Sequence, residues 1–133
     1  MKISRSTGYG LVGVAYIAQN CKEGLVLAGS ISKEYNIPLA YLFKILLQLV
    51  RVNILRSKRG PHGGFSLARP AEEITMLEII ETIDGPMKGH LFLAEQTGNV
   101  PFSLKMEDVC RKATQEIKTV YQKSTLSAML APD

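Results

Sequence analysis

Five segments of this chain have apolar residues at helical spacing, and a segment with alternating apolar residues lies between the third and the fourth. The pattern predicts helices at about residues 3–20, 28–35, 38–52, 75–84 and 104–122. The fourth helix is the clearest, because Thr75 and Glu78 form a capping-box pattern at its start and Gly85 and Pro86 follow its end. The chain is therefore expected to be mainly helical.

The second and third helices are expected to form a helix-turn-helix at about residues 28–51. Asn36 supports a tight turn between them, and Pro38 suits the first position of the third helix, where a missing N–H is harmless. The residues expected to face inward follow the helical period: Ala28, Ile31, Tyr35, Leu42, Ile45, Leu46 and Leu49. The opposite side of the third helix is partly basic, as in helices that read DNA.

A β-hairpin is predicted at about residues 54–68, directly after this pair. Two apolar-alternating runs flank the sequence Gly-Pro-His-Gly-Gly, and glycine adopts the φ values that a tight turn needs. The run that enters the turn contains Arg56, Lys58 and Arg59. A lone basic hairpin could equally be solvated surface, but after a helix-turn-helix it indicates the wing of a winged helix. The expected fold is thus a winged helix-turn-helix followed by a long C-terminal helix.

The last helix has one long apolar side at nearly heptad spacing, which predicts a helix–helix interface. This side comprises Met106, Val109, Cys110, Ala113, Ile117, Val120 and Tyr121. It packs either on a second subunit or on the first helix of the same chain. Proteins that read two-fold symmetric DNA sites need a dimer, which favours the second subunit.

Charge is divided unequally along the 133 residues, whose net charge is +4. Residues 1–70 hold ten Lys and Arg against two Asp and Glu, a net charge of +8, and residues 71–133 hold six against ten, a net charge of −4. A basic region on an otherwise acidic protein is typical of a nucleic-acid-binding face. An anionic membrane would also attract it, but the sequence has no lipidation motif and no apolar run of spanning length.

This length suits one domain with three regions. Residues 1–84 are expected to form the DNA-binding winged helix-turn-helix, and residues 85–103 a connecting loop of a length that often serves sensing. Residues 104–133 are expected to provide the dimerisation helix and a C-terminal segment.

The remaining chemistry of the chain is sparse. Cys21 and Cys110 are isolated from one another, so they suggest neither a ligand pair nor a disulfide framework, and a reducing cytoplasm is the simplest compartment. Lys2 and Arg5 precede an apolar stretch as in a signal peptide, but the helical stripe within that stretch favours a core helix. The sequence has no nucleophile–base pairing and no phosphate-cradling motif, so no enzyme is expected.

Candidate contacts to double-stranded DNA divide into those that position the protein and those that read bases. The expected phosphate contacts are Lys2, Arg5, Ser30, Ser32 and Lys58, and Arg51 and Ser57 complete the predicted interface. The expected major-groove readers are Ala40, Tyr41, Phe43, Lys44 and Gln48. Arg59 is expected in a narrow minor groove, where His62 either assists it or is solvated. Phe43 and Leu47 are unusual on an outward face. Either Phe43 indicates T-rich half-sites, or the two residues form an apolar patch for something other than DNA; covering the base of the wing is a further possibility for Leu47.

Four segments of the sequence resemble the Rrf2-type winged-helix regulators, the family of the IscR-, NsrR- and CymR-like proteins. They are Lys2-Ile3-Ser4, Ile37-Pro38-x-x-Tyr41-Leu42, Arg59-Gly60-Pro61-x-Gly63-Gly64-Phe65-x-Leu67-Ala68-Arg69-Pro70 and Ile74-Thr75. The resemblance implies a homodimeric bacterial transcription factor, usually a repressor. It also implies that the third helix enters the major groove, that the wing reaches the flanking minor groove and that the last helix forms the dimer interface.

Several such regulators hold an iron–sulfur cluster with three cysteines between the fourth helix and the dimer helix, and this chain departs from that pattern. No cysteine lies between Gly85 and Lys105, and Leu104 and Glu107 stand where the family's third cysteine and a nearby histidine would be. An iron–sulfur cluster requires several thiolate ligands, so Cys110 cannot hold one by itself. The chain therefore resembles the cluster-free, CymR-like members more than the cluster-holding ones, and no cofactor is expected.

The effector of such a regulator would be a metabolite or a partner protein, and the connecting loop is the candidate contact, through Leu91, Phe92, Leu93 and Phe102. His90 in the same loop is either a haem or metal ligand or a surface residue. Two alternatives stay open: a winged-helix protein-interaction module that does not bind an operator, and a redox-, haem- or cluster-sensing regulator with unusual ligands.

Overall fold

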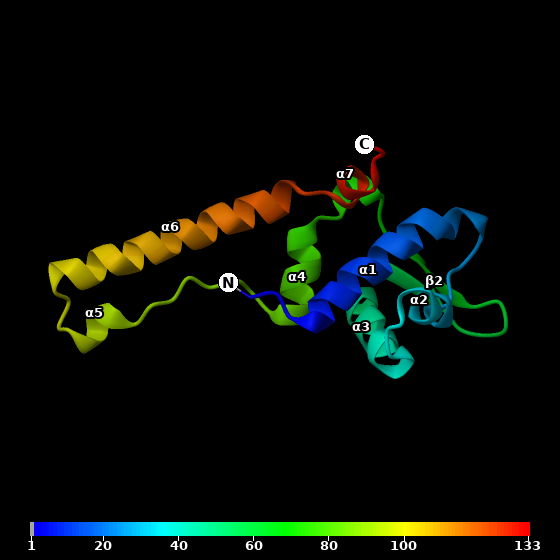
Figure 1. Ribbon diagram of the computed structural model, residues 1–133, viewed down its shortest axis with the longest axis horizontal. Coiled ribbons are helices and arrows are strands. Elements are labelled where there is room, and N and C mark those ends of the chain that lie inside the picture. The colour runs from blue at the N-terminus through cyan, green and yellow to red at the C-terminus, as the bar shows by residue number, and fades with distance from the viewer. Residues whose placement is uncertain (1) are drawn as a thin grey trace.

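The computed structural model, which describes residues 2–133, consists of a helical body from which one long helix projects (Figure 1). The elements of the body are α1 (Arg5–Asn20), η1 (Cys21–Glu23), α2 (Ala28–Tyr35), α3 (Leu39–Arg51), β1 (Leu55–Lys58), β2 (Gly64–Leu67), η2 (Ala71–Glu73) and α4 (Met76–Asp84). They are followed by α5 (Leu93–Gln96), the projecting α6 (Pro101–Lys123) and α7 (Leu126–Leu130). The predicted fold class, mainly helical with one antiparallel hairpin, is confirmed.

The central helix α1 packs closely against α3 and α4 because two of its glycines lie at the contacts. A Cβ atom at Gly10 would lie 2.3 Å from Cδ1 of Ile83 in α4 and 3.3 Å from Cγ2 of Ile45 in α3. At Gly13 it would lie 3.0 Å from a methyl group of Leu46. The helix propensity that these glycines cost is thus offset by the close approach of three helices.

The core beneath α3 is formed by the side chains that the helical period predicted. Leu42, Ile45, Leu46 and Leu49 are all buried, as are Ala28 and Ile31 of α2. The inward position predicted for Tyr35 is wrong, because α2 ends at this residue and its side chain is 51% exposed. Its ring meets Tyr16 of α1 edge-on, with the ring centroids 6.0 Å apart.

Helix α4 begins with the capping box that the sequence predicted. The Thr75 hydroxyl accepts the N–H of Glu78, and the Glu78 carboxylate accepts the N–H of Thr75. The same carboxylate pairs with the guanidinium of Arg69 at 3.0 Å. Because Arg69 follows β2 and also donates to the Asn53 carbonyl, this network ties the base of the hairpin to α4.

The start of α1 is tied to the end of α4 through Ser4 and Asp84. The Ser4 hydroxyl caps α1 by accepting the N–H of Thr7, and both its hydroxyl and its own N–H donate to the Asp84 carboxylate. Burial alone would raise the pKa of Asp84, but these hydrogen bonds outweigh it, so the pKa lies below its usual value.

The C-terminal segment returns to the body instead of continuing along α6. The Thr125 and Thr75 backbones form an isolated bridge, and the N–H of Leu126 donates to the Ile74 carbonyl at 2.8 Å. Leu126 is 5% exposed and joins the main core. Helix α6 thus contacts α4 near its end and α5 near its start, and α7, which follows it, packs on the body. None of the helices described is both long and apolar enough to cross a membrane.

Candidate nucleic-acid interface

The turn between α2 and α3 is stabilised by backbone conformation and by one serine. Asn36 ends α2 in the left-handed conformation, with φ 52° and ψ 50°. The Ile37 N–H donates to the Ser32 carbonyl at 3.0 Å, and the Ser32 hydroxyl donates back to the Ile37 carbonyl. Ser32, a predicted phosphate contact, is therefore half-buried within the turn, whereas Ser30 is exposed. The sequence predicted Pro38 at the first position of the third helix. In the structure Pro38 is the N-cap residue, and α3 begins at Leu39.

The outer face of α3 presents most of the predicted base readers to solvent. Exposed side chains on this face are Leu39, Ala40, Tyr41, Phe43, Lys44 and Arg51, and Gln48 is half-buried. Leu39, which starts the helix, was not among the predicted residues. The N-terminal part of a recognition helix is the part that reaches base edges, so this face has the arrangement that major-groove reading requires.

Tyr41 connects the outer face of α3 to the start of α1. Its hydroxyl lies 2.6 Å from the Ser6 hydroxyl, and its ring meets Tyr9 edge-on with centroids 6.0 Å apart. Arg5, next to Ser6 in the chain, and Lys2 are both exposed. The structure therefore brings the first turn of α1 beside α3, as the predicted interface requires.

The hairpin has the short basic form expected of a wing. Leu55 pairs with Leu67 and Lys58 with Gly64, and the tip exposes Arg59 and His62. The tip requires glycine, because a Cβ atom at Gly63 would lie 2.2 Å from the Lys58 carbonyl oxygen.

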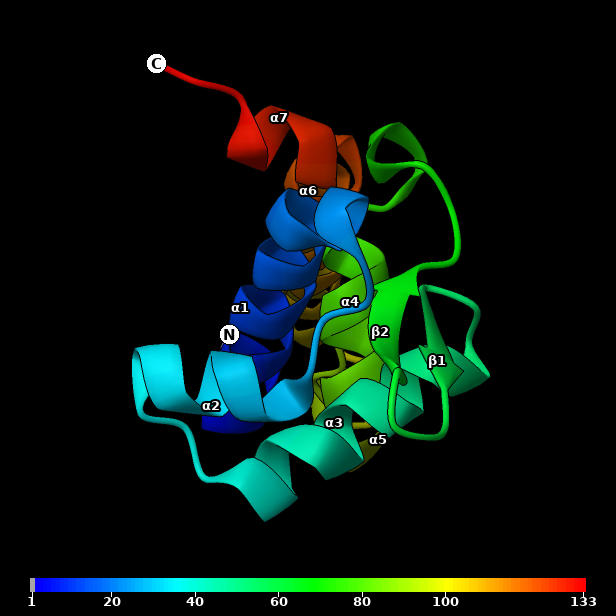
Figure 2. The same ribbon diagram turned by 90° about the vertical axis from the view of Figure 1, so that its right-hand side faces the viewer.

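Arg56 lies on the same side of β1 as Lys58, two residues away, and is also exposed. It was not among the predicted contacts, although the alternation of the strand could have identified it. Together with α2 and α3, the hairpin occupies the end of the body away from α6 (Figures 1 and 2).

Phe43 contacts the wing instead of standing free on α3. Its ring meets Phe65 of β2 at an interplanar angle of 74° with centroids 5.9 Å apart, while 47% of the side chain stays exposed. Leu47, one turn further along α3, is half-buried against the core. Of the two apolar residues that are unusual on an outward face, Phe43 thus joins α3 to the hairpin and Leu47 packs on the core.

The basic residues of this surface have no acidic partners in the described part of the chain. The ion pairs of residues 2–133 involve Arg69, Arg111, Lys112 and Lys118. The remaining cations, which keep their charge for an external anion, include Lys2, Arg5, Lys44, Arg51, Arg56, Lys58 and Arg59. Such a surface attracts a polyanion through the field of all its charges together.

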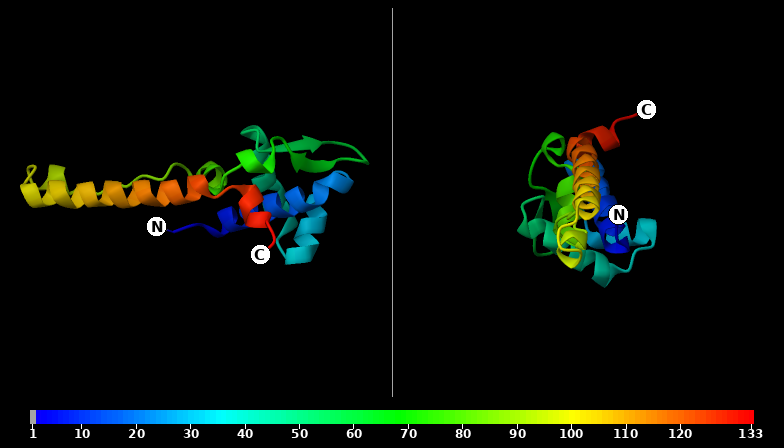
Figure 3. Two further views of the ribbon diagram at one scale, coloured as in Figure 1. Left: turned by 90° about the horizontal axis from the view of Figure 1, so that it is seen from above. Right: turned by 90° about the vertical axis from the view of Figure 1, so that its left-hand side faces the viewer.

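Helix α6 has two apolar sides where the sequence predicted one. Met106, Val109, Ala113 and Val120 are exposed and follow spacings of three, four and seven residues. Cys110, Ile117 and Tyr121 are half-buried on the neighbouring side. Since α6 projects from the body (Figure 3), Met106, Val109 and Val120 keep about half or more of their surface in solvent, whereas Ala113 also borders a cavity beside the connecting loop.

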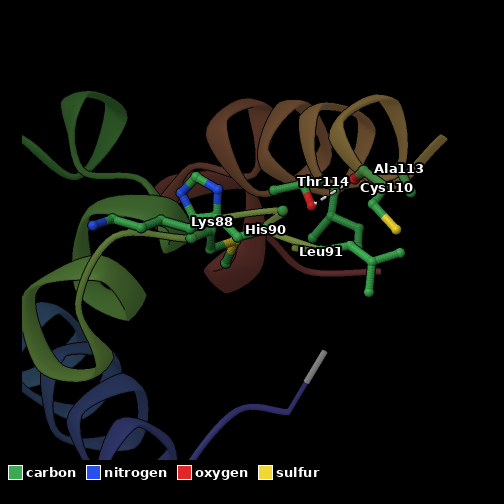
Figure 4. A pocket seen from close by; sticks show the side chains of 9 residues that line it. Lys88, His90, Leu91, Cys110, Ala113 and Thr114 are labelled. Carbon is green, nitrogen blue, oxygen red and sulfur yellow. Dashed lines mark hydrogen bonds between the residues drawn. The ribbon is translucent and has the colours of Figure 1, made fainter. Parts of the chain in front are cut away.

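The neighbouring side of α6 faces the connecting loop across a cavity of about 360 Å³ (Figure 4). Gly89 lies flat on the helix, since a Cβ atom there would be 2.7 Å from the Cys110 carbonyl oxygen. The imidazole of His90 and the thiol of Cys110 lie on opposite sides of this cavity (Figure 4). His90 stacks on Phe92, with the rings 5.5 Å apart.

The donors of this chain do not fit an iron–sulfur cluster. Cys21 is in η1 and Cys110 is in α6, and residues 2–133 contain no group of three or more His, Cys, Asp or Glu that could hold a metal ion. Glu107 accepts the N–H of Ala94 at 2.7 Å and so caps the short α5. Cluster ligation needs several thiolates, which this donor set lacks.

Comparisons with known proteins all indicate the same family. Residues 3–132 match the family described as Rrf2, iron-dependent transcriptional regulator. The HTH-type transcriptional regulator IscR of Cereibacter sphaeroides is 38% identical over 86 residues, which are 63% of this chain and 56% of that protein. The chain thus spans little more than half the length of this relative.

Two solved structures resemble the whole chain. CymR (YrzC), the global cysteine regulator of B. subtilis, superposes with a TM-score of 0.77 at 25% identity, covering 98% of this chain and 96% of that one. IscR of T. potens gives a TM-score of 0.76 at 28% identity, covering 98% and 86%. The named relatives are transcriptional regulators, in agreement with the expectation that the chain is not an enzyme.

Proposed function

The chain belongs to the Rrf2 family of transcriptional regulators, and on this premise we propose that it is a cytoplasmic homodimeric repressor that binds a palindromic operator. The observation that supports this best is the surface formed by α3, the start of α1 and the hairpin, whose cations have no carboxylate partners in the described residues. A transcription factor needs such a surface, because phosphate contacts supply much of its affinity.

Each part of this surface has its own task on DNA. The outer face of α3 lies in the major groove, where Lys44 reads guanine and Ala40 contacts a thymine methyl group. Arg59 enters the flanking minor groove from the tip of the wing. Lys58, Arg56 and Arg5 contact phosphates on either side and fix the orientation of the protein.

The dimer forms along the exposed side of α6. Met106, Val109, Ala113 and Val120 leave exposed apolar surface along one side of a helix of 23 residues, and such surface is costly to leave in water. Packing against the same helix of a second copy buries it and creates the two-fold symmetry that a palindromic operator matches.

The signal is a metabolite or a partner protein, because the thiolates of a cluster-sensing member are missing. The alternative of a protein-binding module without operator binding rested on Phe43 and Leu47. Both residues have a role within the chain as contacts between α3 and the hairpin or core, so this alternative has no separate support.

A titration of fluorescently labelled duplexes tests the proposal. Anisotropy should rise on adding the protein to a pool of random duplexes in dilute buffer, and the affinity should fall steeply with added salt. A chain that leaves the anisotropy unchanged at low salt, although it is folded by circular dichroism, would contradict DNA binding.

A further inference from the structure

We propose that the cavity between the wing and the recognition helix is a binding site for a small amphipathic anion, an aromatic carboxylate in chemical class. The cavity has a volume of about 380 Å³, within the size range of small-molecule sites. It lies between the start of α2, the outer side of α3 and the turn of the hairpin. The regulatory part of this inference rests on the proposed function, whereas the binding part does not.

The floor of the cavity is apolar and partly aromatic. Phe65 is 3% exposed and forms its base, Leu47 is half-buried beside it, and Phe43 and Leu27 leave about half of their surface in solvent. A flat aromatic ligand would bury this remaining surface and would meet the edge-on pair of Phe43 and Phe65.

The lining of the cavity includes positive charge, which favours an anionic ligand. Arg59 and Lys58 are among the lining residues and no acidic residue is, although Lys58 lies on the other face of the hairpin from Phe65, which pairs with Ser57. Neither cation forms an ion pair within residues 2–133. Leu27, which precedes α2, offers no side-chain cap, so the positive end of this eight-residue helix adds to the same field.

Occupancy of this cavity would compete with operator binding. The carboxylate would neutralise Arg59, which the proposed function assigns to the minor groove. The ring would also lie against Phe43, on the face of α3 that enters the major groove. The chain would then release DNA when the ligand binds, which gives the cluster-free regulator a means of sensing.

Nuclear magnetic resonance titration with 1-naphthoate tests the site directly on the free, full-length protein. We expect saturable shifts of the amide resonances of Gly60, Gly63 and Gly64 in the wing. Acetate, which has the charge alone, should leave these resonances unchanged, and the neutral 1-naphthamide should bind about tenfold more weakly.

Two phenylalanine variants locate the ligand. Phe43→Ala should weaken 1-naphthoate binding by about tenfold or more, because a large apolar contact is lost. Phe92→Ala, which removes an exposed phenylalanine in the connecting loop, should leave binding unchanged. Loss of binding in Phe92→Ala alone, or equal binding of acid and amide, would overturn the site.

A second titration separates this inference from the proposed function. Adding 1-naphthoate to a protein–duplex complex should lower the anisotropy at constant ionic strength. Wing shifts in a protein that binds no duplex would refute the proposed function and leave the site intact. A protein that binds the operator, but whose Gly60, Gly63 and Gly64 amide resonances do not shift at the highest soluble 1-naphthoate concentration, would refute the site and leave the function intact.

Discussion

Phe43 illustrates what a sequence can and cannot predict for a single side chain. Its position on the outer face of α3 follows from helical spacing, and the structure has it there. Its contact with Phe65, 22 residues further along the chain, depends on the angle between the hairpin and α3. Side-chain periodicity contains no information about that angle, so the cavity beneath Phe43 could not be predicted.

The wing tip provides the first test at the scale of the residue. Arg59→Ala should weaken binding to the operator by roughly 1–3 kcal/mol, because one specific groove contact is lost. The measurement is a gel-shift titration on a selected operator. Arg111→Ala, which removes an arginine from α6, is the matched control and should bind as the wild type does. Equal affinity for Arg59→Ala would show that the tip does not contact DNA.

Lys58 should affect affinity differently, because a phosphate contact is independent of sequence. Lys58→Ala should reduce the slope of log affinity against log salt concentration by about one, on specific and random duplexes alike. Lys105→Ala on α6 should keep the wild-type slope. An unchanged slope for Lys58→Ala would mean that this ammonium group stays in solvent when DNA is bound.

At the scale of the element, local signals predicted more than long-range ones. The capping box of Thr75 and Glu78, the turn at Asn36 and the glycine-rich hairpin tip are all short-range patterns, and all three were confirmed. The return of α7 to the body was not predicted, because it depends on a backbone bridge between Thr75 and Thr125. The start of α6 at Pro101 was placed three residues too late, since the first turn of the helix lies outside the apolar stripe.

The contact of α1 with α3 and α4 can be tested with a matched pair of glycine variants. Gly10→Val should lower the free energy of unfolding by roughly 1–3 kcal/mol relative to Gly8→Val, because it overpacks the contact with Ile83 and Ile45. A Cβ atom at Gly8 would have no atom of another element within 4 Å, so both variants share the change in helix propensity, and the contact with Ile83 and Ile45 distinguishes Gly10→Val. The measurement is urea denaturation at one fixed protein concentration. Equal stabilities would mean that α1 is not tightly packed at Gly10.

At the scale of the whole molecule, the projecting α6 separates the proposed DNA-binding surface from the proposed dimer contact. The helix leaves the body on the side away from α2, α3 and the hairpin (Figures 1 and 3). Two copies joined along their α6 helices would therefore keep both recognition surfaces free. The sequence predicted the helix and its apolar residues, but the division of these residues into a free side and a side against the connecting loop required the structure.

Val109→Glu tests the dimer without harming the fold of one chain, since Val109 is 64% exposed. A charge among the exposed apolar residues of α6 should raise the dimer dissociation constant by roughly thirtyfold or more. Gln122→Glu introduces the same charge away from these residues and should stay dimeric. Sedimentation equilibrium measures both, and a dimer of unchanged strength in Val109→Glu would exclude this side of α6 as the interface.

The most direct test of the central claim is selection of bound fragments from a pool of random duplexes, followed by sequencing. Two recognition helices related by a two-fold axis should enrich an inverted repeat with one fixed spacing between its half-sites. Recovery of a pool without any common sequence, from a protein that is folded and dimeric, would contradict the account.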